Sequence, residues 1–475
     1  MSSLATESPK SPAGTMSFSG CEDGGQSGEP VAPARDSSPQ LRKGEVIRSP
    51  KPMVGSRLGL REVNVICWGI LVTLALIIGT LVWGHVKGGE GFDFVYFYGV
   101  GRLASEHPPA RLYDYASQLQ VFHDVRPAQK EHYGPSPYPP FVGLFFSNFS
   151  RLPFQAAYFL WMAISLALYV LGVRAVLQAS MAGEPLKASL ATCFALAFPP
   201  FLLFTLVNGQ LASVAVFCVG FAIYEEERQK LFLSGLFLSI LAYKPTLLLL
   251  IVPMLCLTRR FKTLMGFIAG VATLVGVSTA FAGMQVWPAY VRLIETFRKL
   301  SAGDTSSGIT GGLRRWQFVD LRSLTYSIPG SQSRIGLALT AVTVSVLAVW
   351  LAVLFWRSAK GGRSVQHLVW GAALIWTLLL NIYVPIYDSV LAVIAILLTI
   401  AAVENLRWQE EVRRIVLAAI AIFVVSWFTR AFAEHYGIQL LTLLFFGFGV
   451  AQACLLQRSF QLESADTRRS ISAEV

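Results

Sequence analysis

Charged residues are scarce in this sequence: Asp, Glu, Lys and Arg make up only 14% of 475 residues, whereas hydrophobic residues make up 54%. Soluble globular domains contain about 25% charged residues, so the composition excludes a chain of ordinary soluble domains. The hydrophobic residues gather in many runs of roughly 20, the length that a helix needs to cross about 30 Å of hydrocarbon. The sequence therefore predicts a bundle of membrane-spanning helices.

Cysteine is also rare, and no C-x-x-C or Cys/His spacing indicates a zinc site or a disulfide framework. A P-loop, a G-x-S-x-G elbow, an H-E-x-x-H helix and a G-x-G-x-x-G turn before a helix are absent too. We therefore expect no metal and no cofactor, and the substrate itself must supply the energy for any reaction. Five cysteines fall in hydrophobic runs and are expected to be small buried hydrophobes: Cys67, Cys193, Cys218, Cys256 and Cys454.

Large hydrophobic residues are nearly missing from residues 1–57, which are rich in Ser, Pro and Gly. Because such a segment cannot form a packed core, we expect a disordered cytoplasmic tail there. A transmembrane domain at 58–457 and a cytoplasmic C-terminal tail at 458–475 complete the predicted organisation. The formal net charge is +11, but Lys and Arg lie between hydrophobic runs, where the positive-inside rule explains them. No nucleic-acid partner is expected.

The hydrophobic runs predict an all-α polytopic membrane protein with about 12 transmembrane helices. Connectors predicted on the inside carry Lys and Arg, whereas the short outer connectors at 208–210 and 381–387 carry none, so both termini are placed in the cytoplasm. Two long loops, about 85–153 and 284–333, then face outwards and are expected to carry the function. The predicted spans are 63–84, 154–178, 188–206, 209–224, 231–243, 245–258, 262–283, 334–357, 365–381, 386–402, 412–431 and 437–457.

Asp93 follows the first predicted span and is surrounded by aromatic residues, including Phe92, Phe94 and Tyr96. A carboxylate at this low-dielectric boundary is well placed to accept a proton, as a general base must. The structural alternative is an Asp that caps a helix at the membrane interface. Both interpretations place Asp93 at the outer membrane boundary.

Other polar residues punctuate the outer ends of predicted spans. Keeping a Lys such as Lys244 in lipid costs about 2.5–3.5 kcal/mol, so an anionic lipid phosphate is a natural partner for it. Lys244 could instead extend its ammonium group to solvent. In the second loop, adjacent Arg residues beside Trp316 suit a phosphate and a sugar face, although such charges are often simply solvated. These residues are Tyr138, Asn208, Gln210, Lys244, Arg314, Arg315, Tyr387 and Asp388.

Together these segments resemble glycosyltransferase family 87, the polyprenyl-phosphate-mannose-dependent mannosyltransferase-like proteins of the GT-C superfamily. The resemblance implies a GT-C fold and a hexosyltransferase that moves a sugar, mannose in first place, from a polyprenyl-phosphate donor. It also implies a lipid or glycan acceptor, inversion at the anomeric carbon and a site on the periplasmic face of a bacterial inner membrane. The matching segments are Asp93-Phe94 with Tyr98, Leu112-Tyr113-Asp114, Tyr138-Pro139-Pro140, Asn208-Gly209-Gln210, Tyr243-Lys244-Pro245 and Tyr387-Asp388.

The family's first-loop Asp is taken as the base that deprotonates the acceptor, and only Asp93 matches its position. The wider superfamily often has two acidic residues in this loop, whereas Phe94 follows Asp93 here, so no metal is expected. The donor phosphate is assigned to Lys244, Arg314 and Arg315. Sugar and acceptor are assigned to Tyr98, Tyr138, Asn208, Gln210, Tyr387 and Asp388.

Two other functions stay open. A transporter or lipid flippase also uses many spans with intramembrane polar residues, but it tends to show internal repeats and charges in the middle of spans. A ligase that moves a whole glycan from a lipid diphosphate is the second alternative. The expected partners are a polyprenyl-phosphate-linked sugar donor, a lipid or glycan acceptor and membrane lipids.

Overall fold

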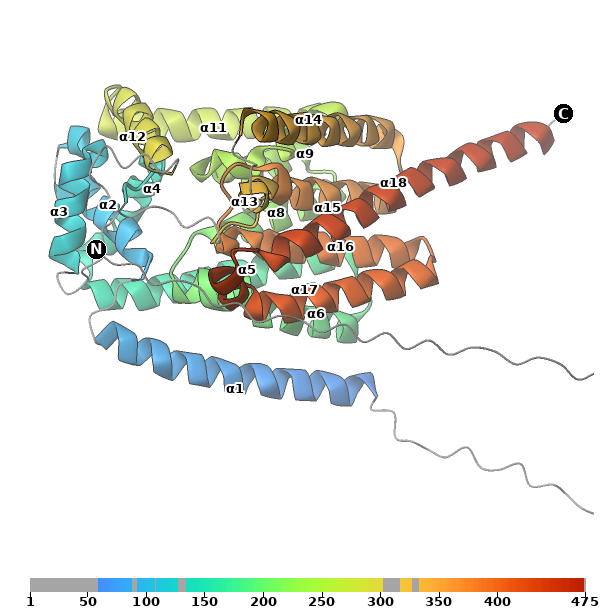
Figure 1. Ribbon diagram of the computed structural model, residues 1–475, viewed down its shortest axis with the longest axis horizontal. Coiled ribbons are helices and arrows are strands. Elements are labelled where there is room, and N and C mark those ends of the chain that lie inside the picture. Colours follow the sequence, from blue (N-terminus) through green and yellow to red (C-terminus); the bar gives the residue numbers. More distant parts are fainter. Residues whose placement is uncertain are drawn as a thin grey trace, which may run out of the picture. The chain divides into compact units, whose positions relative to one another are not determined.

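A computed structural model describes residues 59–87, 92–106, 108–126, 134–301, 317–326 and 333–473 (Figure 1). Most of the described residues form helices, and the only β pairing among them is an isolated bridge between Phe318 and Pro385. This confirms the predicted all-α class. The tail predicted at residues 1–57 lies outside the described residues, as do Arg314 and Arg315.

Seven of the described helices are long and apolar enough to cross a membrane, or eight if a pair bent by 49° counts as one span. The bent pair is α6 (Pro185–Ala197) with the segment Pro199–Val207. A polytopic membrane protein is thus confirmed, but the count of twelve spans is not, although each expected segment overlaps a helix. These candidate spans are α1 (Leu60–Lys87), α5 (Phe154–Ser180), α11 (Phe261–Ala282), α14 (Arg334–Arg357), α16 (Leu391–Asn405) together with the turn that precedes it from Ile386, α17 (Gln409–Tyr436) and α18 (Leu440–Ala473).

The remaining helices of the bundle are not among these candidate spans. They are α8 (Ala212–Glu227), α9 (Leu231–Ser239), α10 (Ile251–Leu257) and α15 (Arg363–Leu380). Two 3₁₀ turns, η4 (Ile240–Tyr243) and η5 (Pro245–Leu248), meet at Lys244 between α9 and α10. Pro245 has no backbone N–H and cannot continue the helical hydrogen bonds, so the chain breaks there as the sequence predicts.

Helices α15 and α16 form the centre of the bundle. Nearly every residue of α16 is buried, including Leu391, Ala395 and Leu398, and Trp370 and Trp376 of α15 are buried beside it. In contrast, α1 and α14 expose large apolar side chains such as Val65 and Ile335. Exposure of apolar residues along a whole helix is typical of a surface that faces lipid.

Glycine pairs let neighbouring helices approach closely. A Cβ atom added at Gly235 of α9 would lie 1.9 Å from the carbonyl oxygen of Thr263 on α11. At Gly220 of α8 it would lie 2.3 Å from the carbonyl oxygen of Gly172 on α5. The hydrophobic effect does not drive helices together inside a bilayer. Close packing through small residues is therefore a common way in which membrane helices associate.

The helices of the two long loops lie together at one end of the bundle (Figure 1), apart from the last of them, which packs against α15. The first loop contributes α2 (Phe94–Glu106), α3 (Tyr115–Val125) and α4 (Pro140–Phe146), and the second contributes α12 (Val286–Ser301) and α13 (Leu321–Tyr326). A separate hydrophobic core joins α2, α3 and α12 and consists of Val95, Val100, Leu103, Leu112, Tyr113, Val121, Phe122, Val286 and Leu293. We call α2, α3, α4 and α12 the loop layer.

Helix α18 continues beyond residue 457 to Ala473, past the predicted start of the C-terminal tail. The expectation that the cysteines are buried needs correction in part. Cys193 and Cys218 are buried as expected, but Cys256 and Cys454 are exposed on α10 and α18. A hydrophobic run does not tell the protein-facing side of a helix from its lipid-facing side.

Candidate active site

Asp93 lies in the turn that begins α2, where the loop layer meets the bundle. The Nε2 of Gln210 donates a hydrogen bond to Oδ2 of Asp93 at 2.7 Å. Gln210 is only 5% exposed and comes just before α8, 117 residues further along the chain. A buried amide thus fixes the orientation of the carboxylate.

The turn that carries Gln210 is held against α2. Gly209 adopts a φ of +71°, and a Cβ atom there would lie 2.8 Å from the Cβ of Phe94. The indole of Trp161 on α5 donates to the carbonyl oxygen of Gly209 at 2.9 Å. Only glycine combines this backbone conformation with this close approach, which explains the Asn208-Gly209-Gln210 sequence.

Lys244 and Asp388 form a buried ion pair. Lys244 lies at the break between η4 and η5, and Asp388 lies in η9 (Ile386–Val390), which leads into α16. Asp388 is 1% exposed and Lys244 8% exposed. The Nζ of Lys244 also lies 5.1 Å and 4.9 Å from the ring centroids of Tyr383 and Tyr387, which is within cation–π distance.

Tyrosines connect Asp93 with the ion pair. Burial raises the pKa of Tyr138 and of Tyr383 above its usual range, and the negative charges of Asp388 and Asp93 raise both further. Both carboxylates therefore act on the same two phenols, whose hydroxyls stay protonated and able to donate. The ring of Tyr138 stacks on that of Tyr243 with centroids 6.5 Å apart. We call Asp93, Tyr138, Gln210, Lys244, Tyr383, Tyr387 and Asp388 the polar cluster.

The second loop closes one side of the polar cluster. The backbone N–H of Val319 donates to the carbonyl oxygen of Val384 at 2.9 Å, and Phe318 packs on Tyr383 with ring centroids 5.0 Å apart. Asp320 is fully buried and accepts the backbone N–H of Ser323 at 2.7 Å and of Val384 at 3.4 Å. Burial raises the pKa of Asp320 despite these bonds.

The sequence did not assign Tyr383 or Asp320 to the site. Asp320 stands three residues before Ser323 at the start of α13, a spacing typical of a helix cap, and this pattern could have identified it. Tyr383 had no such signal beyond its place in an outer turn. Both residues join the site through the contact between the second loop and the segment before η9.

Other predicted residues lie elsewhere. The hydroxyl of Tyr98 donates to the carbonyl oxygen of Leu152 at 2.7 Å, and its ring packs on Phe94 and Phe154. We therefore assign Tyr98 to the packing of α2. Asn208 is half-buried in the same turn as Gln210. Within the described part of the chain, no three His, Cys, Asp or Glu side chains are grouped closely enough to hold a metal ion.

The polar cluster combines a carboxylate held by an amide, a cation with its own counter-ion, and phenolic donors. This set suits a reaction that removes a proton from a hydroxyl and stabilises a departing anion. A family model for glycosyltransferase family 87 matches residues 137–381, just over half of the chain. The chain belongs to glycosyltransferase family 87. It is therefore a membrane glycosyltransferase.

Membership of glycosyltransferase family 87 confirms the resemblance recognised in the sequence. The matched residues include Tyr138, Gln210 and Lys244, whereas Asp93 and Asp388 lie outside the match. The structure brings these two carboxylates to the matched residues. Comparison with curated proteins and with solved structures finds no match.

Proposed function

We propose that this protein transfers a hexose from a polyprenyl-phosphate donor to a hydroxyl group of a lipid or glycan acceptor, with inversion at the anomeric carbon. Mannose is the hexose that we propose first. The observation that supports this proposal best is the polar cluster, in which Tyr138 and Tyr383 are influenced by the charges of both Asp93 and Asp388, the partner of Lys244. The sugar is already activated by its phosphate, so the protein needs a base, a partner for the leaving phosphate and a place for the lipid.

Asp93 is the proposed base. Inversion requires the acceptor oxygen to attack the anomeric carbon from the side opposite to the phosphate, while a carboxylate removes the hydroxyl proton. The hydrogen bond from Gln210 orients this carboxylate, and preorganised polar groups lower the barrier because they need not rearrange during the reaction.

Lys244 is the proposed partner of the donor phosphate, assisted by tyrosine hydroxyls. An ammonium group carries three N–H donors, and one of them serves Asp388. Asp388 thus aims Lys244, while the remaining donors are available for phosphate oxygens. Arg314 and Arg315 of the second loop remain proposed phosphate ligands.

We place this site on the periplasmic face of a bacterial inner membrane, with both termini in the cytoplasm, because basic residues concentrate in the connectors at the other end. A cysteine at Ser105, which is exposed in the loop layer, should react with a membrane-impermeant thiol reagent in intact spheroplasts. A cysteine at Gly362, in the connector between α14 and α15, should react only after lysis. Labelling of Gly362→Cys alone in intact spheroplasts would reverse the orientation.

The donor is tested directly by incubating the purified protein with a panel of labelled polyprenyl-phosphate sugars and lipid or glycan acceptors. Transfer of mannose to an acceptor, with release of polyprenyl phosphate, is the expected result. Movement of an intact lipid-linked sugar across liposomes without cleavage would favour the flippase. Transfer only from a lipid diphosphate glycan would favour the ligase.

A further inference from the structure

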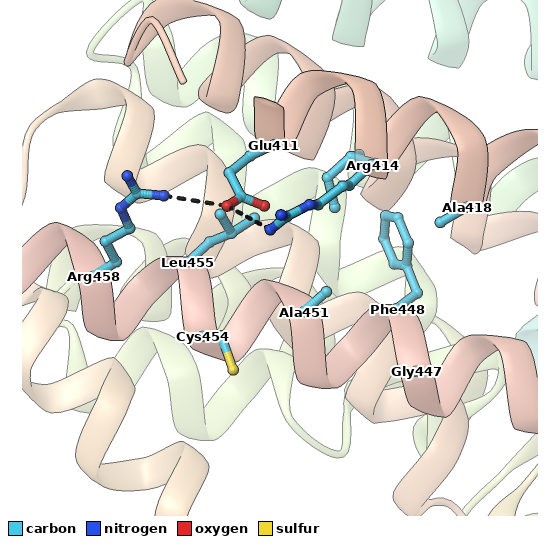
Figure 2. A pocket seen from close by; sticks show the side chains of 10 residues that line it. Glu411, Arg414, Ala418, Gly447, Phe448, Ala451, Cys454, Leu455 and Arg458 are labelled. Carbon is cyan, nitrogen blue, oxygen red and sulfur yellow. Dashed lines mark hydrogen bonds and ion pairs between the residues drawn. The ribbon is translucent and has the colours of Figure 1, made fainter. Parts of the chain in front are cut away.

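Helices α17 and α18 enclose a groove, whose lining side chains are drawn in Figure 2. Its volume is about 330 Å³, far more than a single water molecule needs. The floor and walls are apolar or small along most of its length. The lining residues are Glu411, Arg414, Ile415, Ala418, Gly447, Phe448, Ala451, Cys454, Leu455 and Arg458.

Two arginines from different helices converge at one end of the groove. The Nη1 atoms of Arg414 on α17 and Arg458 on α18 each lie 3.2 Å from Oε1 of Glu411 (Figure 2). The side chains of Arg414 and Arg458 are 70% and 51% exposed, whereas that of Glu411 is 21% exposed. Two cations share one carboxylate, so this end of the groove carries an excess of positive charge that is open to solvent.

The groove lies at the end of the bundle opposite the polar cluster. Helix α16 begins just after Asp388 and ends at Asn405, a few residues before Glu411 in the first turn of α17. The same end carries the ion pair of Lys187 with Glu404. A ligand of this groove is therefore separate from the donor and the acceptor of the proposed reaction.

We propose that this groove binds an anionic phospholipid, with the phosphate at Arg414 and Arg458 and an acyl chain against Phe448, Ala451 and Leu455. One guanidinium group can donate two parallel hydrogen bonds to the oxygens of one phosphate. The arginines project beside helices whose other surfaces expose Leu417, Ile420 and Leu443, as expected of helices in lipid. A basic site continuous with an apolar groove matches the amphipathic form of a phospholipid, and basic pockets between transmembrane helices bind such head groups.

The test uses the full-length protein in detergent, titrated with phosphatidylglycerol or phosphatidylcholine of the same chain length and followed by native mass spectrometry. Wild type should retain phosphatidylglycerol more tightly than phosphatidylcholine. The double variant Arg414→Gln/Arg458→Gln should lose about tenfold or more in affinity for phosphatidylglycerol, since hydrogen bonds to charged groups contribute about 1.5–3 kcal/mol. Arg413→Gln, exposed on the same helix but outside the groove, should change the affinity less than about twofold.

A second variant keeps the charges and fills the apolar part. Ala451→Phe should displace the acyl chain and weaken phosphatidylglycerol binding, whereas Ala431→Phe, at an exposed position of α17, should not. Equal retention of the two lipids by wild type would overturn the proposal. So would equal losses in Arg413→Gln and the double variant, or displacement of phosphatidylglycerol by millimolar inorganic phosphate together with no effect of Ala451→Phe. None of these outcomes depends on sugar transfer.

Discussion

Replacing Asp93 by Asn should slow sugar transfer by about 10²–10⁴-fold, the usual loss when a general base is removed. Asn has the same shape, and its amide oxygen can still accept the hydrogen bond from Gln210. Folding, membrane insertion and donor binding should therefore stay near those of wild type. Turnover measured at saturating donor and acceptor, with donor affinity measured separately, isolates the chemical step.

The matched control is Asp114→Asn in the same loop layer. Asp114 caps α3 and accepts the backbone N–H of Ser117 at 2.9 Å. Its substitution should leave turnover close to wild type. Wild-type turnover in Asp93→Asn would show that the base lies elsewhere, and Asp388 would be the next candidate.

Removing one member of the Lys244–Asp388 pair should destabilise the protein strongly. Lys244→Met leaves Asp388 as a buried negative charge without a partner. Asp388→Asn leaves Lys244 as a buried positive charge without a partner. Such losses cost about 3–5 kcal/mol, whereas replacing both charges together is often close to neutral. Thermal unfolding should therefore show two unstable single variants and a double variant, Lys244→Met/Asp388→Asn, near wild-type stability.

The double variant also separates a phosphate ligand from a structural ion pair. If Lys244 contacts the donor phosphate, the stable double variant should bind the donor at least about tenfold more weakly, because a charge-assisted hydrogen bond is lost. Wild-type donor affinity in a folded double variant would contradict the proposed role and leave Lys244 as a structural residue. The measurement is a donor titration of the purified variants.

Much of the polar cluster could be predicted because its members interrupt hydrophobic runs. Asp93, Gln210, Lys244 and Asp388 each stand at the end of an apolar segment, where a polar residue is conspicuous. Which of them meet could not be predicted. The pairing of Lys244 with Asp388 depends on how η9 packs between neighbouring helices, and a pattern of spans contains no such distances.

For Tyr98, in contrast, the sequence suggests a role in the site that the observed contacts do not require. It lies in the aromatic segment after Asp93, so the sequence suggests a ligand contact, yet its hydroxyl is bonded to the backbone at Leu152. The span count is not confirmed for a related reason. The short helices α9 and α10 are partly surrounded by other helices, so hydropathy and length alone do not decide whether they cross the membrane.

The Lys244–Asp388 contact also bears on how the chain is assembled. The two residues are 144 positions apart, so Lys244 emerges from the ribosome long before its counter-ion exists. During that interval Lys244 has no counter-ion in an apolar segment, where an unpaired Lys is costly. We therefore expect the short helices α9 and α10 to reach their final depth only after η9 has been synthesised.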